Sequence, residues 1–248
     1  MEADDQGASR AAKGRFATTQ WSLVVSAGDS QSPQARDAME SLARVYWYPL
    51  YAYLRRAGTS AHDAEDLTQG FFANRIVTRE LFKGVSPDRG RFRTWLLNCL
   101  RNFQRNEWQA KNAKKRGGGV QHVSLDGADW EDRLLASGGE ELSPPEEYDR
   151  AWAITMIKRA HEQLRAKYCA AKAESFDQLS VHLPGVGTPP PIAETARTLA
   201  KSIAATKMAV SRLRREFGLA LRDEISRTVS TPEELDEELR YLISAIGR

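Results

Sequence analysis

The sequence predicts an all-α protein with two small helical domains joined by an acidic flexible linker, the second containing a helix-turn-helix, and followed by a C-terminal helix. Apolar residues recur at spacings of three and four over most of the chain, and no stretch shows the alternation of a strand. An acidic segment rich in glycine and proline interrupts this pattern. The expected parts are a disordered N-terminus at 1–15, a first domain at 16–113, the linker at 114–146, a second domain at 147–226 and an extension at 227–248.

Composition narrows the class of protein. The chain has 248 residues, of which 41% are hydrophobic and 28% charged, so it can pack cores beneath a heavily charged surface. No apolar run approaches the ~18 residues of a membrane helix, and the N-terminus lacks the apolar core of a secretory signal. We therefore expect a cytoplasmic protein without membrane insertion. Cys99 and Cys169 form no CxxC and no metal-ligand spacing, which argues against a zinc module or disulfide scaffold.

Turn and capping residues delimit the helices of the first domain. A short helix is expected after Thr18 or Thr19. The next begins at Ser32-Pro33, an N-cap followed by proline at the first helical position, and ends at Gly58. Pro49 lies inside it and is expected to kink it or split it in two. A third helix should start at Thr59 or Ser60, with acidic residues in its first two turns, where they suit the positive end of the helix dipole.

The segment 91–113 predicts a helix with two contrasting sides. A 100° advance per residue gathers Phe92, Leu96, Cys99, Leu100 and Phe103 on one side. The other side carries Thr94, Asn98, Arg101, Asn102, Arg105 and Gln109, with Trp95 and Trp108 at its edges. Amide groups, guanidinium charge and aromatic surfaces together suit unpaired bases and phosphates, although an ordinary amphipathic helix shows a similar pattern.

In the second domain, helices are expected at 145–168, 174–183, 191–200 and 202–225, with a breaker-rich loop at 184–190. The last two are joined by a tight turn, and Ser202 caps the second of them, which fits a helix-turn-helix. Thr206, Val210, Leu213 and Phe217 should point inward. Lys207, Met208, Ser211, Arg212 and Arg215 should point outward, with Arg214 alongside, and such a face suits the major groove of DNA.

A final amphipathic helix opens with Thr231-Pro232-Glu233-Glu234, an N-cap, an N1 proline and a capping-box acid. Its apolar side, formed by Leu235, Leu239, Leu242 and Ile246, must be buried somewhere. We expect it to lie against the second domain or against a partner, in an autoregulatory or domain-packing role.

Charge is polarised along the chain. Residues 87–116 carry a net +7 and residues 201–222 a net +5, while residues 117–147 between them carry −7. Two basic segments in separate candidate domains favour a protein that binds a polyanion over a set of solvated helix faces.

Three stretches in series resemble a known family. They are DAEDLTQGFF at 63–72, FRTWLL at 92–97 followed by RN at 101–102, and AETARTLAKSIAATKMAVSRLRR at 193–215. Together with the linker they cover about residues 16–226. On these motifs the chain resembles a sigma factor of RNA polymerase, of the extracytoplasmic-function (ECF) group in the sigma-70-like family.

The resemblance implies DNA-templated transcription initiation, in which core RNA polymerase is directed to promoter DNA through −10 and −35 elements. It implies that the first stretch binds polymerase, through Asp63, Glu65, Asp66, Gln69 and Phe72. It assigns the −10 element to Arg93, Trp95, Asn98, Arg101, Asn102, Arg105 and Gln109. It assigns the −35 element to Ser202, Lys207, Met208, Ser211, Arg212, Arg214 and Arg215. The linker would thread toward the RNA exit path, and an anti-sigma factor or a Ser/Thr kinase would be a further partner.

The helix-turn-helix departs from the family's pattern at three positions. Thr195 stands where a larger aliphatic is usual, Ala200 where glycine is common, and Thr206 where valine is typical. These residues predict looser packing or altered promoter specificity, without loss of the fold.

Two other function classes were weighed. A stand-alone helix-turn-helix regulator would use 191–222 but leave 63–72 and the linker without a purpose. An enzyme is disfavoured, because the sequence has no P-loop, no GxSxG and no dinucleotide fingerprint, and His62 with Asp66 makes at most part of a metal site. We therefore expect no catalytic residues, no metal and no cofactor.

Overall fold

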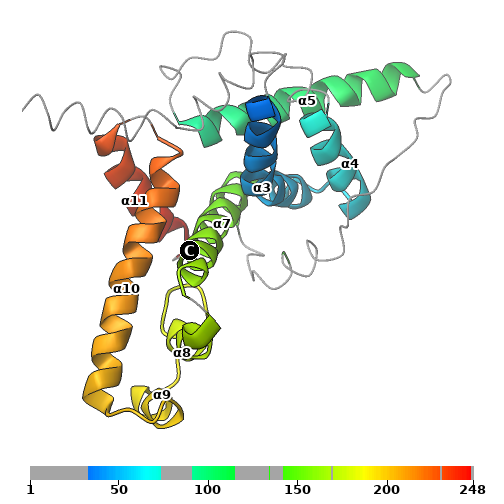
Figure 1. The fold of residues 1–248 in the computed structure, drawn as a ribbon. Helices are drawn as coiled ribbons and strands as arrows, with labels where there is room; N and C mark the ends of the chain where they lie inside the picture. The colour runs from blue at the N-terminus through cyan, green and yellow to red at the C-terminus, as the bar shows by residue number, and fades with distance from the viewer. Residues whose placement is uncertain are drawn as a thin grey trace, which may run out of the picture. The chain divides into compact units, whose positions relative to one another are not determined.

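A computed structural model describes residues 33–73, 91–114, 134, 142–168, 170–229 and 231–246 (Figure 1). All regular secondary structure in these ranges is helical, in agreement with the predicted all-α class. The chain separates into two compact units, one formed by residues up to Trp152 together with those from Arg227, and the other by Ala153–Ser226. The predicted N-terminus, the short helix after Thr18 and nearly all of the linker lie outside the described residues.

The first unit begins with α3, Pro33–Arg56, and α4, Ala61–Phe71. Helix α3 continues through Pro49 as one element, so it is not split in two. It ends as predicted: Gly58 has a φ of 88°, its amide donates to the Arg55 carbonyl at 3.0 Å, and the Thr59 amide donates to the Leu54 carbonyl at 3.0 Å. This is a Schellman cap, whose left-handed position favours glycine.

Helix α5, Phe92–Lys114, completes the core of the first unit with its apolar side. Its Phe92 packs edge-on against Tyr46 of α3, with ring centroids 5.3 Å apart. Phe103, three turns along, packs against Phe71 of α4 at 5.7 Å. The intervening Leu96 and Leu100 are also buried, so the side predicted to be apolar faces the core.

Helix α7, Pro144–Ala166, contains the boundary between the units, and its first turns belong to the first unit. A capping box opens it: the amide and hydroxyl of Ser143 both donate to a Glu146 carboxylate oxygen, at 3.0 and 2.6 Å. The first unit also includes α11, Pro232–Ile246, which begins as predicted, with the Glu234 amide donating to the Thr231 hydroxyl at 3.3 Å.

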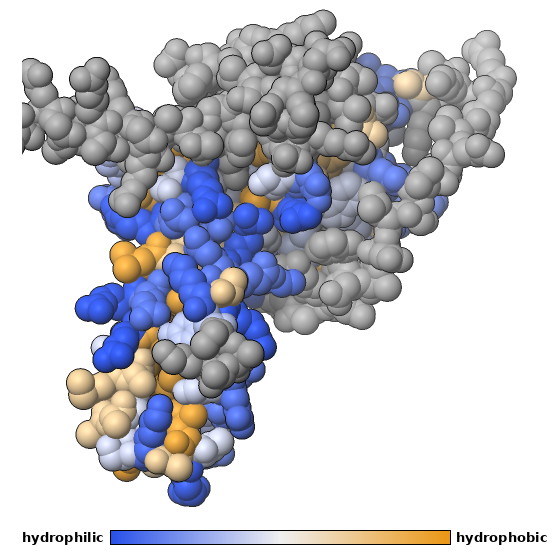
Figure 2. All heavy atoms as spheres, viewed as in Figure 1, coloured by the Kyte–Doolittle hydropathy of each residue, from blue (hydrophilic) through white to orange (hydrophobic). Residues whose placement is uncertain are grey.

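The second unit holds the rest of α7 with α8, Ala170–Ser180, α9, Ile192–Thr198, and α10, Ile203–Ser226. Helix α8 starts and ends earlier than the predicted 174–183. The buried core of this unit comes from all four helices and includes Met156, Leu164, Phe176, Ala196, Leu213 and Phe217. Outside these cores the surface in view is mainly hydrophilic (Figure 2). No helix within the described ranges is long and apolar enough to cross a bilayer.

Candidate nucleic-acid interface

Helix α4 presents the acidic residues predicted to bind polymerase. Asp63 is exposed, and Glu65 and Asp66 are partly exposed. Asp63 also serves the helix itself, because its amide donates to the Ser60 hydroxyl at 3.1 Å and its carboxylate accepts from that hydroxyl at 2.7 Å. Asp66 lies 3.6 Å from the Nε2 of His62, one turn earlier.

The other two residues predicted for this surface differ in their exposure. Gln69 is partly exposed. Phe72 is only 8% exposed, and its ring stacks on Trp47 of α3 with centroids 5.5 Å apart. Phe72 is therefore part of the core, and the accessible members of the predicted set are the carboxylates and the Gln69 amide.

The polar side of α5 faces solvent. Asn98, Asn102, Arg105 and Gln109 are exposed, and Trp108 is 67% exposed. An indole that is two-thirds accessible next to guanidinium and amide groups provides a stacking surface beside hydrogen-bonding groups. The helical wheel therefore predicted the direction of this side correctly, apart from Cys99, which is half-buried rather than in the core.

Arg101 and Trp95 lie at the border between the polar side of α5 and the core. The Nε of Arg101 donates to the Tyr53 hydroxyl at 3.0 Å, and the guanidinium carbon lies 5.3 Å from the centre of that ring. Its Nη1 reaches the Asn98 side-chain oxygen at 3.5 Å. Trp95 is half-buried against Phe92, with ring centroids 5.4 Å apart. Arg101 is thus held in one orientation while part of its guanidinium stays accessible.

Arg93 does not lie with this polar side, contrary to the sequence analysis, which grouped it with the other −10 residues. It is 6% exposed, and its guanidinium is enclosed by carboxylates and aromatic rings. The Nε donates to Glu238 of α11 at 2.6 Å, and Nη1 pairs with Asp149 of α7. The guanidinium carbon lies 4.2 Å from the centre of the Tyr241 ring. In this arrangement Arg93 joins three helices of the first unit, and its guanidinium is too deeply buried to contact a nucleic acid.

Electrostatics are consistent with this structural role. Burial alone lowers the pKa of Arg93, but the hydrogen bond that Arg93 donates to Glu238 and the charges of Glu238 and Asp149 outweigh it, so the pKa lies above its ordinary value. Burial and the hydrogen bond to Asp149 raise the pKa of Tyr241. The ion pair and the neutral phenol therefore both persist at physiological pH.

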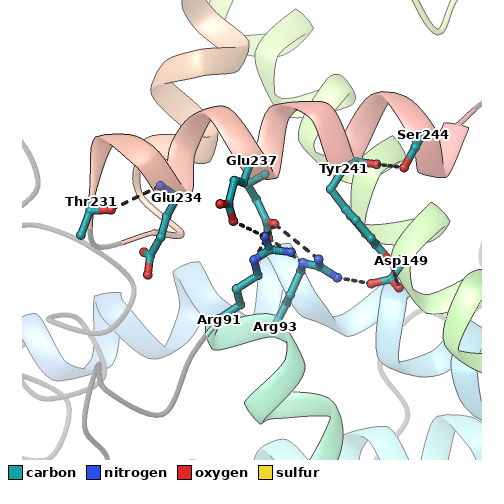
Figure 3. A network of polar contacts seen from close by, with 9 residues as sticks. Arg91, Arg93, Asp149, Thr231, Glu234, Glu237, Tyr241 and Ser244 are labelled. Carbon is teal, nitrogen blue, oxygen red and sulfur yellow. Dashed lines mark hydrogen bonds and ion pairs between the residues drawn. The ribbon is translucent and has the colours of Figure 1, made fainter.

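Arg91 repeats these contacts at the surface. Its Nη2 donates to Glu237 at 2.9 Å, and its Nε lies 3.3 Å from Glu238 (Figure 3). The sequence analysis expected the apolar side of α11 to lie against the second domain or a partner. Helix α11 belongs to the first unit, where its acidic residues meet two arginines at the start of α5 and its Tyr241 hydroxyl donates to Asp149, a residue of the predicted second domain.

A second buried carboxylate of the first unit is less well satisfied. Glu147 has no exposed surface, neither of its carboxylate oxygens has a hydrogen-bond partner, and the nearest cation is Arg56 at 3.8 Å. Burial raises the pKa of Glu147, and the charges of Arg150 and Arg56 oppose this shift without cancelling it.

In the second unit, the structure accommodates the three residues predicted to loosen the packing, which are Thr195, Ala200 and Thr206. The Thr195 hydroxyl lies 2.8 Å from Nε2 of His182, which is 5% exposed. The Thr206 hydroxyl, also buried, donates to the Ser202 carbonyl at 3.1 Å. Each hydroxyl has a partner, so neither leaves a buried polar group unsatisfied.

Ala200 has a φ of 50°, in the left-handed region that favours glycine. The Ala200 amide donates to the Arg197 carbonyl at 3.1 Å, and the Lys201 amide donates to the Ala196 carbonyl at 2.9 Å. These bonds form a Schellman turn between α9 and α10, which alanine adopts at a steric cost.

The outward side of α10 is accessible as predicted. Its members Ser202, Lys207, Met208, Ser211, Arg212, Arg214 and Arg215 are all exposed, opposite the buried Thr206, Val210 and Leu213. Arg214 differs from the rest, because its Nε donates to the His182 carbonyl at 3.1 Å. Burial, followed by the charge of Arg214, lowers the pKa of His182, so the imidazole is neutral in the folded unit at neutral pH.

Sequence reasoning missed His182, Asp149, Glu238 and Tyr241 as members of these networks. Arg93 and Glu238 are 145 positions apart, and no local spacing relates them. The sequence offered one signal that His182 is buried. Its neighbour Leu183 continues the apolar pattern of α8 up to the predicted breaker loop.

Within the described ranges, no three histidine, cysteine, aspartate or glutamate side chains come together to hold a metal ion. Comparison of this chain with family models, curated proteins and solved structures finds no match.

Proposed function

We propose that this protein is a transcription initiation factor that binds core RNA polymerase and directs it to promoters through two DNA-binding surfaces. The observation that carries the proposal is the pair of accessible cationic helix faces, one in each unit. On α5 the face combines amides and arginines with the exposed Trp108, and on α10 it combines arginines with small and apolar side chains.

The two faces suit different forms of DNA. Stacking on an exposed indole requires a base with a free face, so the α5 surface suits a separated strand. A regular helix with cations and few bulky groups fits the major groove of an intact duplex, so the α10 surface suits double-stranded DNA. We assign −10 recognition to the first and −35 recognition to the second, with Arg93 removed from the −10 set.

Polymerase binding is assigned to the accessible carboxylates of α4. Glu65, Asp66 and Asp63 are the candidates, and the carboxylates of Asp63 and Asp66 also contact Ser60 and His62 within the same helix. Phe72 contributes indirectly, by fixing α4 on α3.

The test is transcription by core RNA polymerase mixed with this protein on a library of promoter fragments. We expect specific start sites with the wild-type chain. Glu65→Lys combined with Asp66→Lys should abolish polymerase binding without loss of helicity. Glu162→Lys, which reverses one carboxylate at an exposed position of α7, is the control for each of the two charge reversals and should bind polymerase normally.

Promoter selection is tested separately with Arg212→Ala and Arg215→Ala, each of which should weaken binding to the upstream element by about 1–3 kcal/mol if it contacts a base edge. Lys158→Ala, at an exposed position of α7, is the matched control. Specific binding of a promoter fragment by the free protein, with no dependence on polymerase, would instead identify a stand-alone regulator. Normal transcription by both sets of variants would refute the assignment.

A further inference from the structure

The outward side of α10 carries an apolar group at its centre. Met208 is 68% exposed, and Ile203 at the start of the helix is 50% exposed. Exposed side chains of this size are costly to leave in water, since full burial of a methionine is favourable by ~1.5–3 kcal/mol. Figure 2 shows pale orange, weakly hydrophobic atoms gathered over the first turns of α10, next to blue hydrophilic ones.

The side chains around Met208 determine what kind of ligand this exposed apolar side chain can contact. At 100° per residue, Met208 lies nearly opposite the buried Val210, with Lys207 and Arg212 on its two sides. Ala204 and Ser211, the neighbours of Met208 along the outward row, have short side chains, so the thioether projects beyond them. The result is a narrow apolar ridge between two cations.

A ridge of this kind matches the floor of a major groove. Lys207 and Arg212 suit the phosphates on either side of the groove, and residues 203–215 contain no carboxylate that would repel them. The apolar group that base pairs display in the major groove is the C5-methyl of thymine. Methionine is flexible and polarisable, so it adapts to the position of such a methyl.

A protein partner fits this surface less well. The next exposed apolar side chain on α10 is Leu219, which is 63% exposed. Arg212 and Arg215 lie between Met208 and Leu219, so the apolar groups do not form the continuous patch that a hydrophobic interface requires. The charge of the intervening residues favours a polyanion as the occupant.

We infer that Met208 reads thymine, through contact between its thioether end and the C5-methyl group of a thymine in the duplex element bound by α10. This inference rests on the proposed function, because it assigns a base to one residue of the −35 surface. Met208 thereby determines specificity, while Lys207 and Arg212 hold the flanking backbone.

The test replaces each thymine of the selected upstream element, one at a time, by deoxyuridine, which differs only in lacking the C5-methyl. Binding of the complete complex of full-length protein and core polymerase is measured on each fragment. With the wild-type chain, one thymine position should lose about three- to fivefold in affinity, the effect of one buried methyl group. With Met208→Ala, the thymine and deoxyuridine fragments should bind equally at that position.

Two controls make the result specific to Met208. Met208→Leu retains an apolar side chain and should retain most of the preference for thymine. Leu219→Ala removes the other exposed apolar group of α10 and should leave the preference unchanged. Equal binding of all deoxyuridine fragments by the wild-type complex would overturn the inference while leaving the proposed function intact.

Other outcomes also overturn the inference, and they differ from one another. Persistence of the thymine preference in Met208→Ala would show that another residue reads the methyl. Loss of polymerase binding in Met208→Ala, with unchanged recognition of DNA, would identify Met208 as a protein contact. Absence of promoter selection by the wild-type complex would refute the proposed function together with the inference.

Discussion

Arg93→Met tests whether the buried ion pairs at the start of α5 hold α11 in the first unit. Arg93 is 6% exposed, and its partners Asp149 and Glu238 are 16% and 1% exposed. Removing one partner of a buried ion pair leaves an uncompensated charge and typically costs about 3–5 kcal/mol. In a domain of this size, that corresponds to a fall in melting temperature of roughly 2–4 °C per kcal/mol.

Arg91→Met is the matched control, because it removes the same charge two residues earlier at the surface. Arg91 is 31% exposed, and its pair with Glu237, which is 57% exposed, contributes at most about 1 kcal/mol. Arg91 also lies 3.3 Å from the buried Glu238, but that carboxylate keeps Arg93 as a partner, so the loss should stay well below that of Arg93→Met. Urea denaturation followed by circular dichroism measures both variants. Hydrogen exchange of the α11 amides, resolved by mass spectrometry, locates the effect, and exchange should accelerate in Arg93→Met alone.

A multiple variant separates the lost ion pair from lost packing. Arg93→Met with Glu238→Met and Asp149→Asn removes the stranded charges and keeps an acceptor for the Tyr241 hydroxyl, so most of the stability should return. Equal and small losses for Arg93→Met and Arg91→Met would refute the reasoning, since they would mean that the guanidinium of Arg93 is accessible to water.

Three further predictions concern single positions. Glu147→Gln should stabilise the first unit by about 1–3 kcal/mol at pH 7, because it removes a buried carboxylate without hydrogen bonds, whereas Glu146→Gln should destabilise the same helix start by about 0.5–1 kcal/mol. The gain from Glu147→Gln should shrink as the pH falls through the raised pKa of the folded chain and should be gone below about pH 4.5, the ordinary value, where the carboxyl is protonated in both states; an equal gain in urea titrations at pH 4 and pH 7 would contradict this. Ala200→Gly should stabilise the second unit by about 0.5–1 kcal/mol, because the backbone strain that it relieves exceeds the entropy that glycine loses on folding. Lys201→Gly should destabilise the unit, because Lys201 has no positive φ and no such strain to relieve. The melting temperatures of the two variants should therefore change in opposite directions. Folding lowers the pKa of His182, so the unfolded chain takes up the proton more readily than the folded chain does. The free energy of unfolding should therefore fall as the pH drops below about 6.5. The same dependence of that free energy on pH in His182→Gln would show that another group is responsible.

Helix boundaries and helix sides were largely predictable from the sequence, because they depend on residues close together in the chain. Gly58 and Thr231 mark a helix end and a helix start where capping preferences place them. The two sides of α5 and α10 follow from periodicity, so Asn98 and Met208 are exposed as expected. A pattern repeated every turn determines which side is buried wherever a core is available.

Partnerships between distant side chains were not predictable, because nothing local relates them. The family resemblance grouped Arg93 with the −10 residues, and only the packing of α11 and α7 around it shows that it forms buried ion pairs. From the sequence, Thr195 predicted looser packing. In the structure, its buried hydroxyl has His182 as a hydrogen-bond partner.

The sequence by itself therefore determined the all-α class, most of the helix ends and the chemistry of each exposed face. Only the tertiary structure decided which charged residues of those faces are accessible. The reason is that a guanidinium can bind a ligand only where it is not already buried in ion pairs with carboxylates of the same chain. Arg212 and Arg215 remain exposed on α10, while Arg93 is enclosed by residues from other helices.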